Sequence, residues 1–167
     1  MAIVPFEENT NSIDGPEFIR KKLHEKLKRG GYAVQDIEKA DALFQAHGLS
    51  DGGQLPVFKR EGLAVWTKSP HLLFGDIETF DEVNVGIYLK REIHALIHIW
   101  DATTKTDMYS CDKTVSTQSM AKNKNAVISQ FVSGLAETWV EHASHKPMAP
   151  EVLQFVETCL DELPLRP

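Results

Sequence analysis

The chain has 167 residues, of which 42% are hydrophobic and 25% charged, as expected for one globular domain able to bury a core. Its net charge of -6 at pH 7 repels phosphate backbones and no dense Lys/Arg stripe offsets it, so we expect no nucleic-acid partner. No apolar run approaches the ~18 residues that span a bilayer.

The N-terminus bears on the compartment. Met1 adjoins residues that are predicted to form the first core strand, and no basic start followed by an apolar run marks a signal peptide. Two origins fit this pattern: a cytosolic protein, or a chain from which a targeting segment was removed and to which Met1 was added.

The first third of the chain predicts a strand, a helix and a second strand. Residues 2–6 form a short apolar strand, and Pro16 begins a helix that ends at Gly30. Its buried stripe consists of residues that recur every four positions, Ile19, Leu23 and Leu27. Residues 32–37 then predict a parallel strand, which completes a βαβ unit.

A second helix and a poorly patterned stretch follow. We predict a helix over 38–47 with Ala42, Leu43 and Ala46 inward, and a turn over 50–54. In residues 55–70 the pattern is weak; we expect a short helix near 56–61 and leave open whether Trp66 is in the core or at the surface.

The second half predicts an antiparallel meander and two helices. The strands cover about 71–80, 88–101 and 107–116. In the middle strand, Ile93, Ala95, Ile97 and Ile99 share one face, which we expect to be the core face, and His94, Leu96, His98 and Trp100 share the other. Helices over 126–145 and about 151–162 complete the chain, the latter with Val152, Val156, Leu160 and Leu163 inward.

Together these elements predict an α/β (α+β) fold with a single mixed five-stranded sheet in the order βαβ-α-βββ, packed with helices. We expect one domain over residues 1–167, with a C-terminal helical extension over about 121–167.

The best candidate for a metal site lies on the predicted sheet. Asp76 and Glu78 on one strand face His94 and His98 on a neighbouring one, and such a set suits zinc or a redox metal. However, strand residues four apart are about 13 Å from each other, too far for both imidazoles to bind one ion. We therefore expect sheet-surface histidines and no metal ligands. His142 and His145, three apart at a helix end, are expected to be surface residues too.

No catalytic or cofactor-binding residue set is predicted. The chain has no Gly-x-Ser-x-Gly elbow, and its double glycine at Gly52 and Gly53 lacks the Lys-Ser/Thr of a phosphate loop. The spacing of Cys111 and Cys159 fits neither a zinc finger nor a thioredoxin motif. Two unrelated thiols are the expectation, and a disulfide formed in an oxidising compartment is the alternative.

Three segments resemble a known group. They are Val4-Pro5-Phe6 at the start, Leu73-Phe74-Gly75-Asp76-Ile77 in the middle and Trp100-Asp101-Ala102-Thr103-Thr104 at the hairpin. With the element order, they resemble the GNA-type outer-membrane lipoprotein family of unknown function, named for a genome-derived Neisseria antigen. This family is similar in turn to the curli-secretion lipoprotein CsgG and to the N-terminal domain of the Tol-Pal protein TolB.

The resemblance implies a CsgG/TolB-N-like domain in the periplasm, tethered to the outer membrane by a lipid on an upstream cysteine. It implies a non-catalytic module that binds envelope proteins in assembly or secretion, with homo-oligomerisation included, and that uses no cofactor. The alternatives are a metal-binding protein or metal-dependent hydrolase using Asp76, Glu78, His94 and His98, and a small-ligand domain. The latter would use the mouth between the first strand's carboxyl end and the loop over 9–15.

Overall fold

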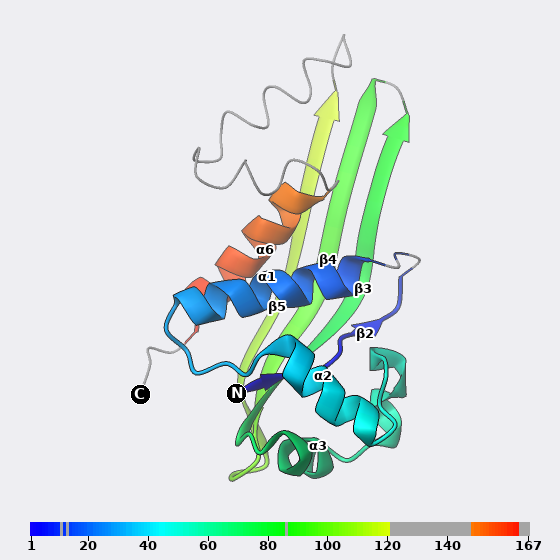
Figure 1. Ribbon diagram of the computed structural model, residues 1–167. Helices are drawn as coiled ribbons and strands as arrows, with labels where there is room; N and C mark the ends of the chain where they lie inside the picture. Colours follow the sequence, from blue (N-terminus) through cyan, green and yellow to red (C-terminus); the bar gives the residue numbers. More distant parts are fainter. Residues whose placement is uncertain (11, 13, 86, 121–147, 164–167) are drawn as a thin grey trace.

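The computed structural model describes residues 1–163, apart from residues 11, 13, 86 and 121–147. It confirms the predicted fold class, because a mixed five-stranded sheet is packed with helices (Figure 1). The elements in chain order are β1 (Ala2–Ile3), β2 (Glu7–Glu8), α1 (Gly15–Arg29), α2 (Ile37–Ala46), the 3-10 helix η1 (Gly52–Val57), α3 (Arg60–Thr67), β3 (His71–Val85), β4 (Tyr88–Asp101), β5 (Thr106–Met120) and α6 (Ala149–Asp161).

The sheet is built round the long hairpin of β3 and β4. Both short N-terminal strands run parallel to β3, β1 beside Leu72 and Leu73 and β2 beside Asp76 and Ile77. β3, β4 and β5 are antiparallel to one another, which is the predicted meander. The sheet order is therefore β1-β3-β4-β5, with β2 continuing the line of β1 along the same edge of β3.

Each face of the sheet carries its own core. On the first face, α1 and α6 cover Leu73 and the predicted core residues of β4, which are all buried as expected: Ile93, Ala95, Ile97 and Ile99. On the second face, α2, η1 and α3 pack against Leu72, Phe74 and Trp100. Neighbouring residues of a strand point to opposite faces, so Leu72 and Leu73 serve different cores.

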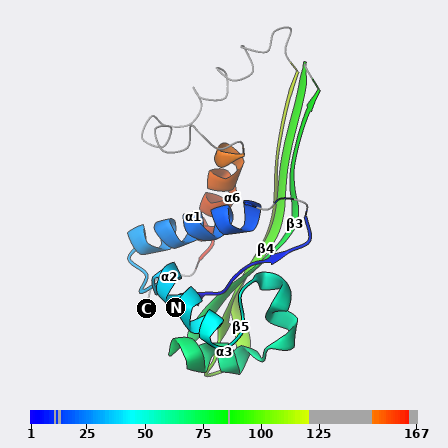
Figure 2. The same cartoon turned by 45° about the vertical axis from the view of Figure 1, so that its right-hand side comes forward.

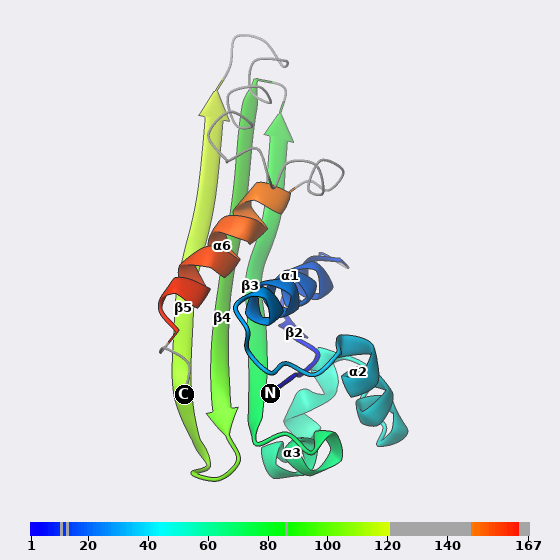
Figure 3. The same ribbon diagram turned by 60° about the vertical axis from the view of Figure 1, so that its left-hand side comes forward.

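The helices cover the sheet unevenly. α1 and α6 cross its middle, and α2 and α3 lie at the end where β3 begins (Figure 1, Figure 3). Seen nearly edge-on, β3, β4 and β5 extend well beyond all four of these helices (Figure 2). We call this the outer end of the sheet; it is where Val85, Tyr88 and Met120 are paired across the three strands.

The predicted strand over 32–37 is not formed. This segment contacts Met1, the residue before β1, through two backbone hydrogen bonds. They run from the Met1 amino group to the Ala33 carbonyl and from the Gln35 N–H to the Met1 carbonyl, each 2.8 Å long. Tyr32 and Val34 pack against the first-face core without joining a ladder. Since β1 has only two residues, it offers no length of backbone for a further strand. The fifth strand is β2, and the crossover from β1 to β3 contains α1, α2, η1 and α3.

The inward face predicted for α2 is wrong. The buried residues are Ile37, Ala40 and Phe44. Of the predicted ones, Ala42 and Ala46 are exposed and Leu43 is half-buried. The observed stripe has the same helical spacing and includes the much larger Phe44 ring, so it removes more apolar area from water.

Three other boundaries also differ. The helix predicted near 56–61 is divided between η1 and α3, with Phe58 extended between them. β3 and β5 continue past their predicted ends, to Val85 and Met120, because backbone pairing with β4 holds their outer parts. α6 confirms the last helix, with Val152 and Val156 buried and Leu160 and Leu163 partly buried. The helix predicted over 126–145, with His142 and His145, lies outside the described residues.

Candidate functional site

The residues of the predicted metal site share the second face of the sheet but do not converge. His94 lies between two carboxylates, with Nδ1 2.9 Å from Glu78 Oε2 and Nε2 2.9 Å from Asp112 Oδ1. Asp76 accepts a hydrogen bond from Asn9 Nδ2 at 3.1 Å. The histidine therefore links β3, β4 and β5, and both of its nitrogens are already engaged.

His98 lies deeper, next to the second-face core. Its ring stacks on Phe74 with centroids 5.1 Å apart, and its Nε2 is buried without a hydrogen-bond partner. Burial lowers the pKa of His98, while the negative charges of Asp107 and Asp76 oppose this shift. Arg60 lies over the other ring of the stack, 5.0 Å from the Phe74 centroid.

In the described part of the chain, no group of three or more His, Cys, Asp or Glu side chains is arranged to hold a metal ion. Asp76, Glu78, His94 and His98 are divided between an ion-pair bridge, a side-chain hydrogen bond and an aromatic stack. The metal alternative therefore gains no support from the arrangement of these residues.

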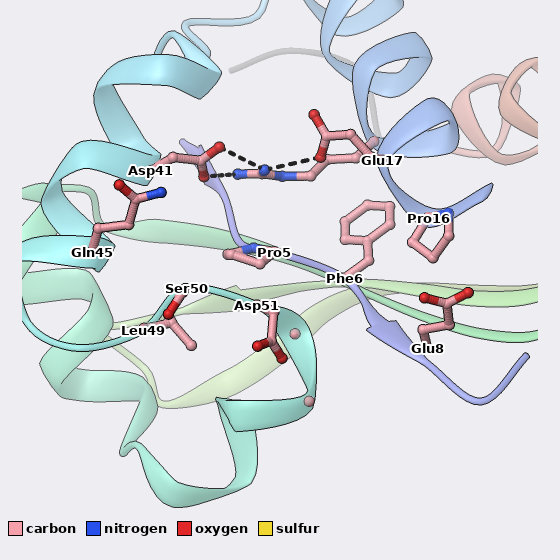
Figure 4. Close-up of a pocket in the computed structure, with 13 residues that line it drawn as sticks. Pro5, Phe6, Glu8, Pro16, Glu17, Asp41, Gln45, Leu49, Ser50 and Asp51 are labelled. Carbon is pink, nitrogen blue, oxygen red and sulfur yellow. Dashed lines mark hydrogen bonds and ion pairs between the residues drawn. The ribbon is translucent and has the colours of Figure 1, made fainter. Parts of the chain in front are cut away.

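A pocket of about 410 Å³ lies at the carboxyl end of β1 (Figure 4). Its walls come from the β1–β2 connection, the first half of α1, the outer side of α2 and the start of η1. The lining residues are Pro5, Phe6, Glu8, Pro16, Glu17, Arg20, Asp41, Gln45, Leu49, Ser50, Asp51, Gly52 and Gly53. The pocket is close to the mouth between the carboxyl end of the first strand and the loop over 9–15, which is where a small-ligand domain would bind its ligand.

Arg20 is the buried charge of this pocket. Its side chain is only 3% exposed and forms a two-pronged ion pair with Asp41 across α1 and α2, with distances of 2.5 and 3.0 Å. It also donates to the Ile3 carbonyl at 2.8 Å and to Glu17 at 3.3 Å. These bonds fix α1, α2 and β1 relative to one another, and they nearly consume the donors of the guanidinium. Its Nε is buried without a partner.

The floor of the pocket depends on Gly52. A Cβ at this position would lie 1.7 Å from the Phe6 carbonyl oxygen and 2.6 Å from the Glu7 nitrogen. Only glycine lets η1 approach the β1–β2 connection this closely. Neighbouring Gly53 has a single near contact, 3.2 Å to the Asp51 carboxylate.

The ionisable side chains of the pocket are mostly acidic. Four carboxylates line it, from Glu8, Glu17, Asp41 and Asp51, against the one guanidinium of Arg20. Phe6 and Pro16 contribute apolar surface beside them. A cavity of this kind suits a small ligand that has a positive charge and some apolar surface.

The outer end of the sheet exposes apolar side chains. Val83, Val85, Ile87 and Met120 are between 45% and 81% exposed. Val85 is paired with Tyr88, and Tyr88 with Met120, so these three form one row across the strands on the second face. We call these four exposed side chains the apolar patch. Such a cluster at the surface is typical of an interaction site.

Cys111 and Cys159 form a disulfide, which corrects the expectation of two unrelated thiols. The bond joins β5 to α6, and the Tyr109 hydroxyl donates to the Cys159 carbonyl beside it. A further ion pair, between Lys113 and Glu162 at 2.8 Å, fastens the same two elements. Disulfides of this structural kind persist in oxidising compartments.

Sequence reasoning missed most residues of the pocket. Arg20 belongs to a basic run on α1, which is typical of a solvated helix face, and nothing in the sequence pairs it with Asp41 on α2. Gly52 was recognised as part of a turn, but the sequence carries no sign of what it approaches. Within the described part of the chain, each helix is too short or too polar to cross a lipid bilayer.

No protein-family model matches the chain, and no curated protein matches it by sequence. Solved structures do match it in fold. Lipoprotein GNA1162 from Neisseria meningitidis has a TM-score of 0.64 and 14% identity, over 80% of this chain and 94% of that one. The PelC dodecamer from Paraburkholderia phytofirmans has a TM-score of 0.53 and 12% identity, over 99% and 87%.

LpoB of E. coli, solved by NMR, has a TM-score of 0.52 and 16% identity, over 70% of this chain and 55% of that one. At these identities the comparisons establish the fold, and they confirm the expected likeness to GNA1162. The relation to CsgG and TolB stays a prediction. The chain has the fold of the lipoprotein GNA1162.

Proposed function

We propose that this protein is a non-catalytic module of the cell envelope that acts by binding proteins through the outer end of its sheet. The observation that carries the proposal is the apolar patch, Val83, Val85, Ile87 and Met120, displayed where the strands extend past the described helices α1, α2, α3 and α6. An interaction surface needs such uncovered apolar side chains on a rigid support.

Two observations support the compartment. The disulfide between Cys111 and Cys159 favours an oxidising environment such as the periplasm. The fold is shared with a protein described as a lipoprotein, so we extend the proposal to a lipid anchor at the outer membrane, attached upstream of this domain. The proposed unit is one domain over 1–167, with the C-terminal segment as a helical extension.

The partners in this proposal are envelope proteins, including further copies of the chain. PelC, which has the same fold, was solved as a dodecamer, and the exposed apolar patch is a suitable surface for such assembly. The net charge of -6 argues against nucleic acid.

The test places a photo-reactive amino acid at Val85 and, as the control, at Val65. Both side chains are well exposed, at 65% and 73%, but Val65 lies on α3 at the opposite end of the molecule. In living cells, ultraviolet light should give discrete protein adducts from position 85 and none from position 65. Equal labelling, or no adduct at position 85, would contradict a binding surface at the outer end.

The compartment is tested separately. Free thiols are blocked in intact cells before lysis, and the peptides that contain Cys111 and Cys159 are then analysed by mass spectrometry. We expect them to be joined. Blocked thiols at both positions would place the protein in a reducing compartment and remove the envelope assignment.

The pocket at the end of β1 favours a second function, the binding of a small cationic ligand. Its acidic lining and apolar Phe6 and Pro16 suit an amine such as arginine amide or putrescine. Calorimetry with these amines should detect binding that Asp51→Asn weakens, while Asp36→Asn, outside the pocket, leaves it unchanged. An equal loss in both variants would indicate only a general charge effect.

A further inference from the structure

β5 is the last strand of the sheet that the structure describes. Among the described residues its sole strand partner is β4, and pairing with β4 runs without interruption from Tyr109 to Met120. On the far side of β5, the N–H and C=O groups that point away from β4 face no other described strand. Such an edge is a ready template for another strand.

The outer half of this edge lacks the charges and bulges that usually protect an edge strand. Residues 114–120 read Thr-Val-Ser-Thr-Gln-Ser-Met, without charge, proline or glycine, and they contain no bulge. The free edge of β3 is different: it has a register shift after Ile77 and carries the acidic pair Asp81 and Glu82. Charges and bulges are the devices that keep edge strands from pairing. Among the described residues, the β3 edge carries these devices and the outer half of the β5 edge does not.

The β5 edge is also held rigidly. The disulfide at Cys111 and the Lys113–Glu162 ion pair fasten the neighbouring part of β5 to α6. An edge that is already in strand conformation loses little conformational entropy when a second strand joins it.

We propose that residues 114–120 of β5 pair antiparallel with the same segment of a second copy, about a two-fold axis at Thr117. This inference rests on the proposed function and names the partner at the outer end of the sheet. The sheets of the two copies then form one continuous layer, antiparallel where the two β5 strands meet.

The chemistry of the edge favours a second copy as the occupant. Two chains of net charge -6 repel each other, so self-association is easiest where the contacting segments carry no charge. Residues 114–120 meet this condition, whereas the β3 edge would bring Asp81 and Glu82 of each copy together.

The two-fold arrangement also brings the same sheet face of both copies to the same side of the joined layer. With Thr117 opposite itself, Thr114 lies across from Met120 and Ser116 across from Gln118. Within each pair, both residues belong to the second face of the sheet. The exposed Met120 side chain, part of the apolar patch, then lies against the partner copy.

Cysteine cross-linking tests the register. Opposed Cα atoms in an antiparallel pair are about 4.5–5.5 Å apart, within the range a disulfide spans. Thr117→Cys should therefore yield a covalent dimer under mild oxidation. Mixing Thr114→Cys with Met120→Cys protein should yield mixed dimers, with the linked peptides identified by mass spectrometry. Thr79→Cys, on the free edge of β3, is the control and should remain uncoupled.

Sedimentation tests the association without cysteines. The full chain should sediment at twice its mass of 18.8 kDa, and Ser116→Lys with Gln118→Lys should return it to a single copy, since four lysines would then oppose one another. Val57→Lys with Val65→Lys adds the same charge at the other end and should leave the dimer intact.

The outcomes separate this inference from the proposed function. A single-copy mass for the unmodified chain would overturn the two-fold pairing. So would a disulfide between Thr79→Cys and Thr117→Cys protein if Thr117→Cys protein formed no disulfide with itself. If position 85 still gave adducts with another protein, the proposed function would stand without it. A dimer that survives both lysines at 116 and 118 would likewise overturn the β5 edge as the interface.

Discussion

Replacing Gly52 by alanine should destabilise the protein out of proportion to the size of the change. The added Cβ would lie 1.7 Å from the Phe6 carbonyl oxygen, 2.2 Å from the Phe6 carbonyl carbon and 2.6 Å from the Glu7 nitrogen. All three are backbone atoms, so no rotation of a side chain relieves the overlap. Either η1 or the β1–β2 connection must move, and the pairing of β2 with β3 is then disturbed.

The magnitude follows from that rigidity. Overpacking a core usually costs about 1–3 kcal/mol, and a contact this close with backbone atoms belongs at the upper end, about 3 kcal/mol. For a chain of this length, that corresponds to a fall in Tm of about 6–12 °C.

The assay is thermal unfolding followed by circular dichroism. Gly53→Ala is the matched control, because its Cβ would meet only the flexible Asp51 carboxylate at 3.2 Å. We expect its Tm to stay close to that of the unmodified protein. Equal Tm values for Gly52→Ala and Gly53→Ala would refute the reasoning, since the close approach of η1 to Phe6 would then not exist.

Three further predictions concern covalent and electrostatic contacts. Replacing Cys111 and Cys159 together by serine opens a loop closed over 48 positions and should lower stability by up to about 4 kcal/mol in denaturant titrations; an unchanged midpoint would mean that the bond is not formed. Arg20→Met leaves Asp41 without its cation and should cost about 3 kcal/mol, whereas Lys21→Met, at the surface of the same helix, should cost under about 1 kcal/mol. Burial and the nearby Asp76 raise the pKa of Glu7 above its ordinary 4.5, so its ionisation opposes folding as pH rises; Glu7→Gln should therefore raise the Tm at pH 7 but not at pH 4.

The sequence predicted those parts of the fold where apolar spacing is regular. The alternation of Ile93, Ala95, Ile97 and Ile99 fixed the core face of β4, and the four-residue spacing of Ile19, Leu23 and Leu27 fixed the buried stripe of α1. A buried face of a strand or helix leaves such a periodic trace because every turn or every second residue must be apolar.

The same reasoning was wrong where a periodic segment had no partner to pair with. Residues 32–37 alternate like a strand, yet β1 is too short to accept them, and Tyr32 and Val34 are partly buried against the first-face core instead. In α2, two sets of apolar residues at helical spacing could face the core, and the set with Phe44 is the buried one. Which set is buried depends on the volume available beneath the helix.

The candidate sites depend almost wholly on contacts between distant segments. The amino-acid order by itself determined an α+β sheet protein, the core face of β4, the meander and the absence of an established catalytic motif, because periodicity and motifs are local properties of a chain. Only the tertiary structure decided that Cys111 meets Cys159, that Arg20 reaches Asp41 and Ile3, and that Gly52 lies against Phe6. These pairings require particular distances and register between elements, and strand register and helix packing are set by the whole core at once.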